Sequence, residues 1–268
     1  MLLSSVIIVL REVLEAALLF SILIALSKQM SLNFRWLVWS LSLGVVGAMV
    51  YGTNINIVSD WFEGVGQEVI NALIQFIIYF MLVFYMVMLT RFFYQKSIPK
   101  SLLCFIMSVI ISMAVTREGA EIILYFFSVT RSGTYYMPVV IGMTIGASIG
   151  VSVGLLFYYL LSNLKLKRSI FIGLVLLLLV SSGMVSQASL LLIQADWLPG
   201  QLPLWNTSNL LSEQSVTGQL LYALIGYEST PTAIQASLYL IGFLLPIGLI
   251  FVVRYASLKG TKYQLSES

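Results

Sequence analysis

The chain lacks histidine, has a single cysteine, and carries few charges for its 268 residues. Because histidine is missing, His-ligated haem, zinc and copper sites and the Glu-x-x-His di-iron pattern are all excluded. The lone thiol, Cys104, has no partner for an internal disulfide, so cysteine usage does not indicate the redox compartment. Charged residues make up 9% of the chain, whereas a soluble domain carries about 25%. The low charge therefore argues against a soluble protein.

Long apolar runs fill most of the sequence. Apolar residues make up 59% of the chain, and its mean hydropathy is +0.98. Runs of about 20 apolar residues predict membrane-spanning helices. Seven such runs occur, at 3–26, 36–54, 67–90, 102–128, 136–162, 169–192 and 232–253. The first contains charges where a signal peptide would be uninterrupted, so we expect a retained span. The predicted fold is an all-α integral membrane protein, with one transmembrane domain over 1–268.

Basic residues are distributed unevenly between the two sides of the predicted membrane domain. Apart from two arginines within spans, one side has Arg131 alone. The other side has Lys28, Arg35, Arg91, Lys96, Lys100, Lys165, Lys167, Arg168, Arg254, Lys259 and Lys262. The positive-inside rule therefore predicts that the N-terminus is outside and the C-terminus is in the cytoplasm. Acidic residues gather on the outer segments, where they would attract cations: Asp60, Glu63, Glu68, Asp196, Glu213 and Glu228.

The longest connection, 193–231, is an outer loop that is too polar to span. Apolar residues at helical spacing from Leu210 to Ile225 predict a helix along the outer interface. The chain has no Gly-rich phosphate-binding motif. We therefore expect no nucleotide or nucleic acid as a partner, and no ATP-driven transport by this chain alone.

A charged string, Arg-Glu-x-x-Glu, occurs at 11–15 and again at 117–121, each time within an apolar run. Charge in hydrocarbon is costly, and it is retained where it is paired or functional. Each copy lies in the first span of a group of three. Because three is odd, the groups 1–90 and 102–192 would face opposite ways, which predicts an inverted repeat followed by a seventh helix. Both motifs would then lie about 10 to 18 Å from the outer ends of their helices.

The motif carboxylates form a candidate metal site. Residues three apart share a helix face, so each motif presents a carboxylate pair. Arg11 and Arg117 precede the last glutamate of their motifs by four residues and are expected to orient the carboxylates and offset their charge. Oxygen-only ligation favours hard cations, and iron, manganese, magnesium and calcium all stay open. The expected ligands are Glu12, Glu15, Glu118 and Glu121.

The alternative is that these ion pairs only fasten helices together. Two arginines would then need only two glutamates, so the excess carboxylates favour a ligand or protons. Asn71 and Gln75 continue a polar stripe from Glu68 down the third span, which either leads to the site or makes interhelical hydrogen bonds. The candidate outer vestibule comprises Asp60, Glu63, Glu68, Asn71, Gln75 and Glu228. Glycines four apart predict close helix packing along the fifth span: Gly142, Gly146, Gly150 and Gly154.

The sequence resembles the oxidase-dependent iron permease family, which includes fungal high-affinity iron permeases and bacterial transporters. The resemblance rests on both charged motifs, on Trp-Phe-Glu-Gly at 61–64, on Leu-Trp-Asn-Thr at 204–207, and on Gly-Tyr-Glu at 226–228. It covers nearly the whole chain. The first motif departs from the family by carrying Val13 where glycine is usual.

The resemblance implies import of Fe³⁺ or Fe²⁺ across the cytoplasmic membrane, with the motif glutamates as iron ligands. Iron is then the substrate, and no permanently bound cofactor is expected. A separate extracytoplasmic partner would oxidise or deliver the iron, and the short loops favour a bacterial origin. Three alternatives stay open: a transporter of manganese or lead, a membrane oxidoreductase with a carboxylate-bound metal, and a structural subunit without an ion path. The missing histidine and dinucleotide or flavin motifs argue against the oxidoreductase.

Overall fold

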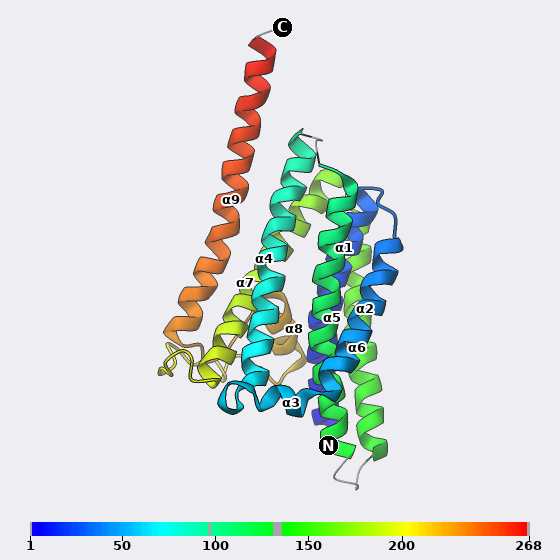
Figure 1. Cartoon of the computed structure of the whole chain (residues 1–268), viewed down its shortest axis with the longest axis vertical. Coiled ribbons are helices and arrows are strands. Elements are labelled where there is room, and N and C mark those ends of the chain that lie inside the picture. Colours follow the sequence, from blue (N-terminus) through cyan, green and yellow to red (C-terminus); the bar gives the residue numbers. More distant parts are fainter. Residues whose placement is uncertain (1, 96–97, 131–135, 267–268) are drawn as a thin grey trace.

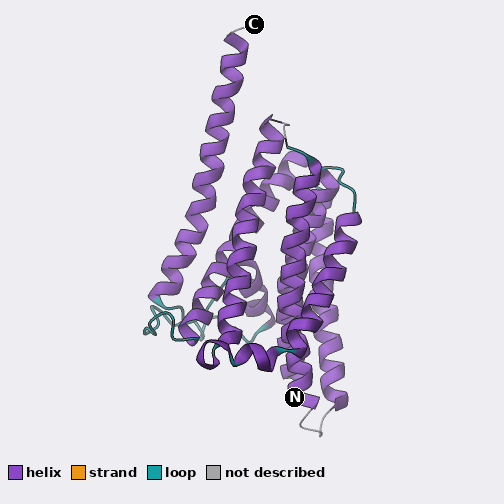
Figure 2. Ribbon diagram, viewed as in Figure 1, coloured by secondary structure: helices purple, strands orange, loops and turns teal. Residues whose placement is uncertain are grey.

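Every regular element in the described part of the chain is a helix, as Figures 1 and 2 show. The computed structural model describes residues 2–95, 98–130 and 136–266. Its long helices are α1 (Leu2–Gln29), α2 (Arg35–Thr53), α4 (Gly66–Gln95), α5 (Lys100–Thr130), α6 (Tyr136–Ser162), α7 (Leu166–Gln194) and α9 (Ala233–Ser266). The short ones are α3 (Ile55–Ser59), the 3₁₀ turn η1 (Trp61–Gly64) and α8 (Val216–Ile225). The predicted all-α class is confirmed.

Six helices of the described residues are long and apolar enough to cross a membrane. These stretches are Arg35–Thr53, Gly66–Phe93, Lys100–Thr130, Tyr136–Ser162, Leu166–Gln194 and Ala233–Tyr255. Helix α1 is long enough, at 28 residues, but the charges of Arg11, Glu12 and Glu15 set it apart from these six. The count of seven spans and the orientation therefore stay predictions. Four of the basic residues used to predict the orientation fall outside this description. Lys96 and Arg131 lie outside the described residues, as do the side chains of Lys259 and Lys262.

The long helices run roughly along one axis, and the two termini lie at opposite ends of the bundle (Figure 1). The α2–α4 connection and the segment between α7 and α9 lie at the end that carries the N-terminus. Lys28 near the end of α1 and Lys100 at the start of α5 belong to the other end, beyond which the last part of α9 extends. The alternating helix directions match those predicted from the apolar runs.

The helices pair in a symmetric pattern. Helix α1 packs most extensively against α6, α2 against α5, and α4 against α7. Helices α1, α2 and α4 of the first group correspond to α5, α6 and α7 of the second. Under this correspondence the pair α1–α6 becomes α5–α2, and the pair α4–α7 becomes itself. An inverted repeat of three helices produces this kind of pattern. Helices α8 and α9 lie outside this exchange.

Glycine allows the paired helices to approach closely. The four spaced glycines of α6 are buried and face α1. A Cβ atom at Gly150 would lie 2.7 Å from Cγ1 of Val13, and one at Gly154 would lie 2.8 Å from Cβ of Ala17. On α2, a Cβ atom at Gly44 would lie 2.7 Å from Cβ of Val115 on α5. The predicted close packing of α6 is confirmed, and α2 packs on α5 in the same way.

The α8 segment packs against α1 and α7. Ser215 begins the helix by accepting a hydrogen bond from the backbone N–H of Gly218 at 3.0 Å. Gly226 ends it with φ of 66°, a left-handed conformation that favours glycine. Ala223 is buried in an apolar cluster with three leucines of α1, namely Leu10, Leu14 and Leu18. The helix is thus shorter than the predicted 210–225 and packs within the bundle rather than along its outer end, because α1 covers its apolar face.

Candidate metal site

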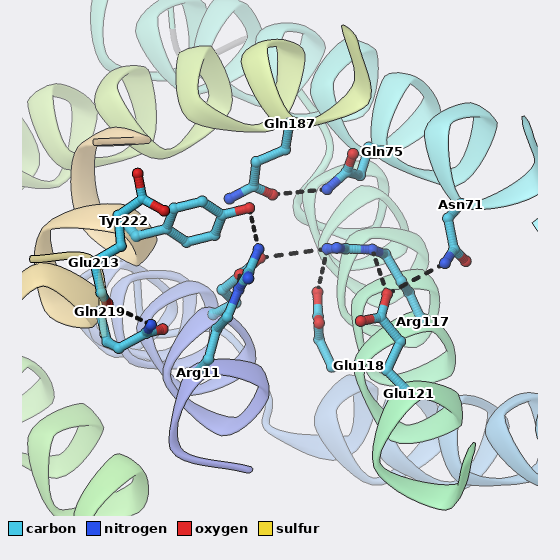
Figure 3. Close-up of polar contacts among 11 residues, drawn as sticks. Arg11, Asn71, Gln75, Arg117, Glu118, Glu121, Gln187, Glu213, Gln219 and Tyr222 are labelled. Carbon is cyan, nitrogen blue, oxygen red and sulfur yellow. Dashed lines mark hydrogen bonds and ion pairs between the residues drawn. The ribbon is translucent and has the colours of Figure 1, made fainter. Parts of the chain in front are cut away.

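The two charged motifs meet where α1 and α5 contact each other, and Figure 3 shows the side chains around this point. Glu12, Glu15, Arg117 and Glu118 are all buried, each with 5% exposure or less. Glu121 is more open, with 27% of its side chain exposed. The antiparallel helices therefore carry all six charged motif residues to one region.

Arg117 occupies the centre of this cluster. Its Nη1 atom lies 2.6 Å from Oε1 of Glu118 on its own helix and 3.3 Å from Oε2 of Glu15 on α1. Its Nε atom lies 3.4 Å from Oε1 of Glu121. A planar guanidinium with several donors suits such a shared position. One arginine thus joins carboxylates of both helices.

Arg11 lies at the edge of the cluster. Its Nε atom is 3.6 Å from Oε1 of Glu15, and its Nη2 atom donates a hydrogen bond to the hydroxyl oxygen of Tyr222 on α8 (Figure 3). Its guanidinium carbon lies 3.9 Å from the centre of the Tyr222 ring. The Arg11 side chain is 37% exposed, against 5% for Arg117. The two arginines therefore occupy different positions, although their motifs are alike.

Three of the four motif glutamates are arranged as a metal site would require. One carboxylate oxygen from each of Glu12, Glu118 and Glu121 lies within 4.8 Å of the other two. Oxygens bound to an ion at about 2.1 Å stand about 3.0 Å apart when adjacent and about 4.2 Å apart when opposite, so the trio would draw together on binding. Glu15 lies outside this group and contacts both arginines. The structure thus brings together three of the four ligands that the sequence predicts.

Two oxygens of this trio are buried without hydrogen-bond partners among the described residues. They are Oε2 of Glu12 and Oε2 of Glu118. A buried carboxylate oxygen without a partner is costly, because it has lost its water and gained nothing in return. A bound cation or a proton at this point would satisfy both atoms. The chemistry of the donor set, oxygen only, suits a hard cation.

Amide side chains of α4 and α7 lie beside the carboxylates. Asn71 donates to Oε1 of Glu121 at 3.2 Å and accepts a hydrogen bond from the Tyr51 hydroxyl at 3.0 Å. Gln75 donates to Oε1 of Gln187 at 2.7 Å, and both residues are buried. Asn71 and Gln75 were predicted from the sequence, whereas Tyr51, Gln187 and Tyr222 were not. Gln187 gave a usable signal, an amide within an apolar run, whereas the tyrosines Tyr51 and Tyr222 gave none.

The other four residues of the predicted vestibule are acidic and are not members of the trio. Asp60 and Glu63 are exposed in the α3–η1 segment, and Glu68 is half-buried in the first turn of α4. Glu228 accepts a hydrogen bond from Nε2 of Gln235 at 2.6 Å. Burial, and then the nearby carboxylate of Glu213, raise the pKa of Glu228 to about 7. These four acidic residues occupy segments at the end of the bundle that carries the N-terminus.

Long apolar helices packed around buried, paired charges are typical of multi-pass membrane transporters. The model of the Iron permease FTR1 family matches residues 2–264, which is nearly the whole chain. The chain therefore belongs to the iron permease family, as its motifs predicted. No curated protein and no solved structure gives a match.

The structure also accounts for the valine in the first motif. Val13 faces Gly150 on α6, where a Cβ atom would lie 2.7 Å from the valine side chain. In the second motif the corresponding residue is Gly119, where a Cβ atom would lie 2.8 Å from Cβ of Ala48 on α2. Each contact thus pairs a glycine with a larger side chain. In the second motif the glycine belongs to the motif helix, α5, whereas at Val13 it belongs to the neighbouring helix, α6.

Proposed function

We propose that this chain imports iron across the cytoplasmic membrane through a buried site formed by the two charged motifs. Glu12, Glu118 and Glu121 are the ligands in the present conformation, and Glu15 serves as the shared counter-ion of the arginines. The observation that carries the proposal is the convergence of these three carboxylates, two of them with unpartnered buried oxygens, in a member of the iron permease family.

The charge balance suits a cation with two or three charges. Four carboxylates and two guanidinium groups leave a net charge near −2 if all are ionised. Arg117 offsets part of the repulsion between the carboxylates, since it reaches three of them. When a cation enters, it competes with Arg117 for Glu118 and Glu121, and when it leaves, the guanidinium takes its place. Fe³⁺ and Fe²⁺ both meet this description, and so does Mn²⁺.

The depth of the site supports transport by alternating access. Glu12 lies ten residues from the start of α1, or about 15 Å, and Glu118 lies twelve residues from the end of α5, or about 18 Å. We propose seven spans, including α1, with the N-terminus outside, so that this depth is measured from the outer face. The symmetric helix pairing supports an inverted repeat, in which the two three-helix groups are interleaved and the site lies where they meet.

The surroundings of the site fit delivery from outside. Acidic residues on the outer segments would raise the local concentration of cations, and a separate extracytoplasmic protein would oxidise or deliver the iron. A bacterial cytoplasmic membrane is the proposed location. Manganese or lead is the alternative substrate, because the same oxygen donors would bind either ion.

Equilibrium binding of radioactive iron to the purified protein tests the site. We expect one ion per chain, competed weakly by Mg²⁺ and Ca²⁺, and lost in each of three variants, Glu12→Gln, Glu118→Gln and Glu121→Gln. Glu15→Gln should weaken binding less, because Glu15 acts through the arginines. Asp196→Asn is the matched control, since Asn tolerates the left-handed conformation at this position, φ of 56°. Full binding in the three ligand variants, or tighter binding of Mn²⁺ than of either iron ion, would contradict the proposal.

A further inference from the structure

The site is asymmetric in a way that its two motifs are not. Arg11 and Arg117 hold the same position in their motifs, yet Arg117 is turned into the cluster and meets three carboxylates. Arg11 contacts only Glu15 in the cluster, through Nε, and its outer nitrogen is bound to Tyr222. Tyr222 belongs to α8, which has no counterpart in the three-helix groups. A residue outside the repeat therefore breaks the symmetry of the site.

Tyr222 contacts Arg11 in two ways. The Tyr222 hydroxyl accepts from Arg11, and the ring lies against the guanidinium at 3.9 Å, so one side chain supplies both a hydrogen bond and a cation–π contact. Tyr222 itself is buried, with 8% exposure. Figure 3 shows the ring pointing from α8 toward Arg11, on the side of the cluster away from Glu121.

Helix α8 is held firmly enough to fix this ring. Besides the leucine cluster on α1, a backbone contact seats it against α7. A Cβ atom at Gly183 of α7 would lie 2.9 Å from both Cα and N of Gly226, the residue that ends α8. Gln219, one turn before Tyr222, donates to the backbone carbonyl of Glu213 at 2.6 Å. The position of the Tyr222 hydroxyl is therefore determined by contacts on two neighbouring helices.

The charges explain what this position achieves. If Arg11 turned inward as Arg117 does, two guanidinium groups would face four carboxylates, and each carboxylate would have a cationic partner. Glu12, the one motif carboxylate that has no ion pair with either arginine, would then be occupied as well. Glu12, which shares α1 with Arg11, instead keeps one oxygen without a partner. The outward position of Arg11 is thus a condition for a cation site on this side of the cluster.

We propose that Tyr222 is a positioning residue of the iron site, which holds Arg11 at the edge so that Glu12 remains available to the cation. This inference rests on the proposed function. It assigns α8 a role in setting the affinity for the cation, with no direct contact to the ion. The effect acts through Arg11 alone, and this makes it separable from damage to the fold.

The test is iron uptake into liposomes by wild type and by Tyr222→Phe, which keeps the ring and removes the hydroxyl. The KM for iron should rise about tenfold, the size expected for one lost hydrogen bond to a charged group, while the maximal rate changes little. Tyr227→Phe is the matched control. Its hydroxyl lies in the same segment but binds Thr207 at 2.8 Å and the carbonyl of Leu211 at 3.1 Å. Its KM should equal that of wild type.

The decisive arm removes Arg11. In an Arg11→Gln background the hydroxyl has no guanidinium to hold, so Arg11→Gln and Arg11→Gln/Tyr222→Phe should share one KM within about twofold, as expected when one residue acts through the other. An unchanged KM in Tyr222→Phe, or an equal rise in the Arg11→Gln background, would overturn the inference while leaving the permease intact. Absence of iron uptake by wild type would instead overturn the proposed function.

Discussion

Replacement of Arg117 by glutamine should destabilise the protein more than any other single change at the site. The Arg117 side chain is 5% exposed, and its nitrogens lie 2.6 to 3.4 Å from carboxylate oxygens of Glu118, Glu15 and Glu121. Glutamine would leave these carboxylates without their central positive charge. Breaking a buried ion pair by removing one partner costs about 3–5 kcal/mol, because the remaining charge is left uncompensated. We expect a loss of this size in the free energy of unfolding.

Removing the closest carboxylate as well should reverse part of the loss. Glu118 is the nearest partner, at 2.6 Å, so Arg117→Gln/Glu118→Gln exchanges a buried ion pair for a neutral amide pair. The double variant should be more stable than Arg117→Gln alone, since the uncompensated charge is smaller. Equilibrium unfolding in mixed detergent micelles measures both quantities, with Arg35→Gln as control because Arg35 is exposed at the start of α2. The reasoning fails if Arg117→Gln stays within about 1 kcal/mol of wild type, or if the two substitutions lower stability additively.

Two further changes test the packing and the outer loop. Gly150→Ala should lower the free energy of unfolding by about 1–3 kcal/mol, because the new Cβ would lie 2.7 Å from Cγ1 of Val13. Gly248→Ala is the control: no atom lies within 4 Å of its new Cβ, so this change should not lower the free energy of unfolding. Equal losses in chemical unfolding would contradict the role given to Gly150. For Glu228, the folded-state pKa is about 7 against an ordinary 4.5, so between these values the folded state holds a proton that the unfolded state lacks. Stability should therefore fall as pH rises through this window, and Glu228→Gln should flatten the profile between pH 5 and 8. An unaltered profile in that variant would assign the pH dependence to other groups.

The sequence predicted the helices well, because a membrane span is a local signal. The apolar run 36–54 became α2, Arg35–Thr53, and the run 136–162 became α6 with the same limits. The charged motifs were equally visible, since a charge inside an apolar run stands out without any knowledge of the fold. Their convergence also followed from the sequence, because two predicted spans lie between the motif helices, which must therefore run antiparallel.

What the sequence did not predict depends on contacts between distant residues. Val13 of α1 packs against Gly150 of α6, and these two helices are adjacent only in the folded bundle. The separation of Glu15 from the other carboxylates depends on where two arginines point. The path of α8 depends on a glycine contact between Gly183 and Gly226. None of these features changes the local pattern of apolar and polar residues, so they cannot be predicted from the periodicity of the sequence.

Uptake of radioactive iron into liposomes that contain only the purified protein would show whether the motif glutamates carry iron through the membrane. Wild type and Glu12→Gln/Glu118→Gln should be compared, with ferrous and ferric iron supplied separately. We expect saturable uptake of one or both ions by wild type and none by the double variant, with both proteins eluting alike in gel filtration. Uptake that persists at the wild-type rate in the double variant would contradict it.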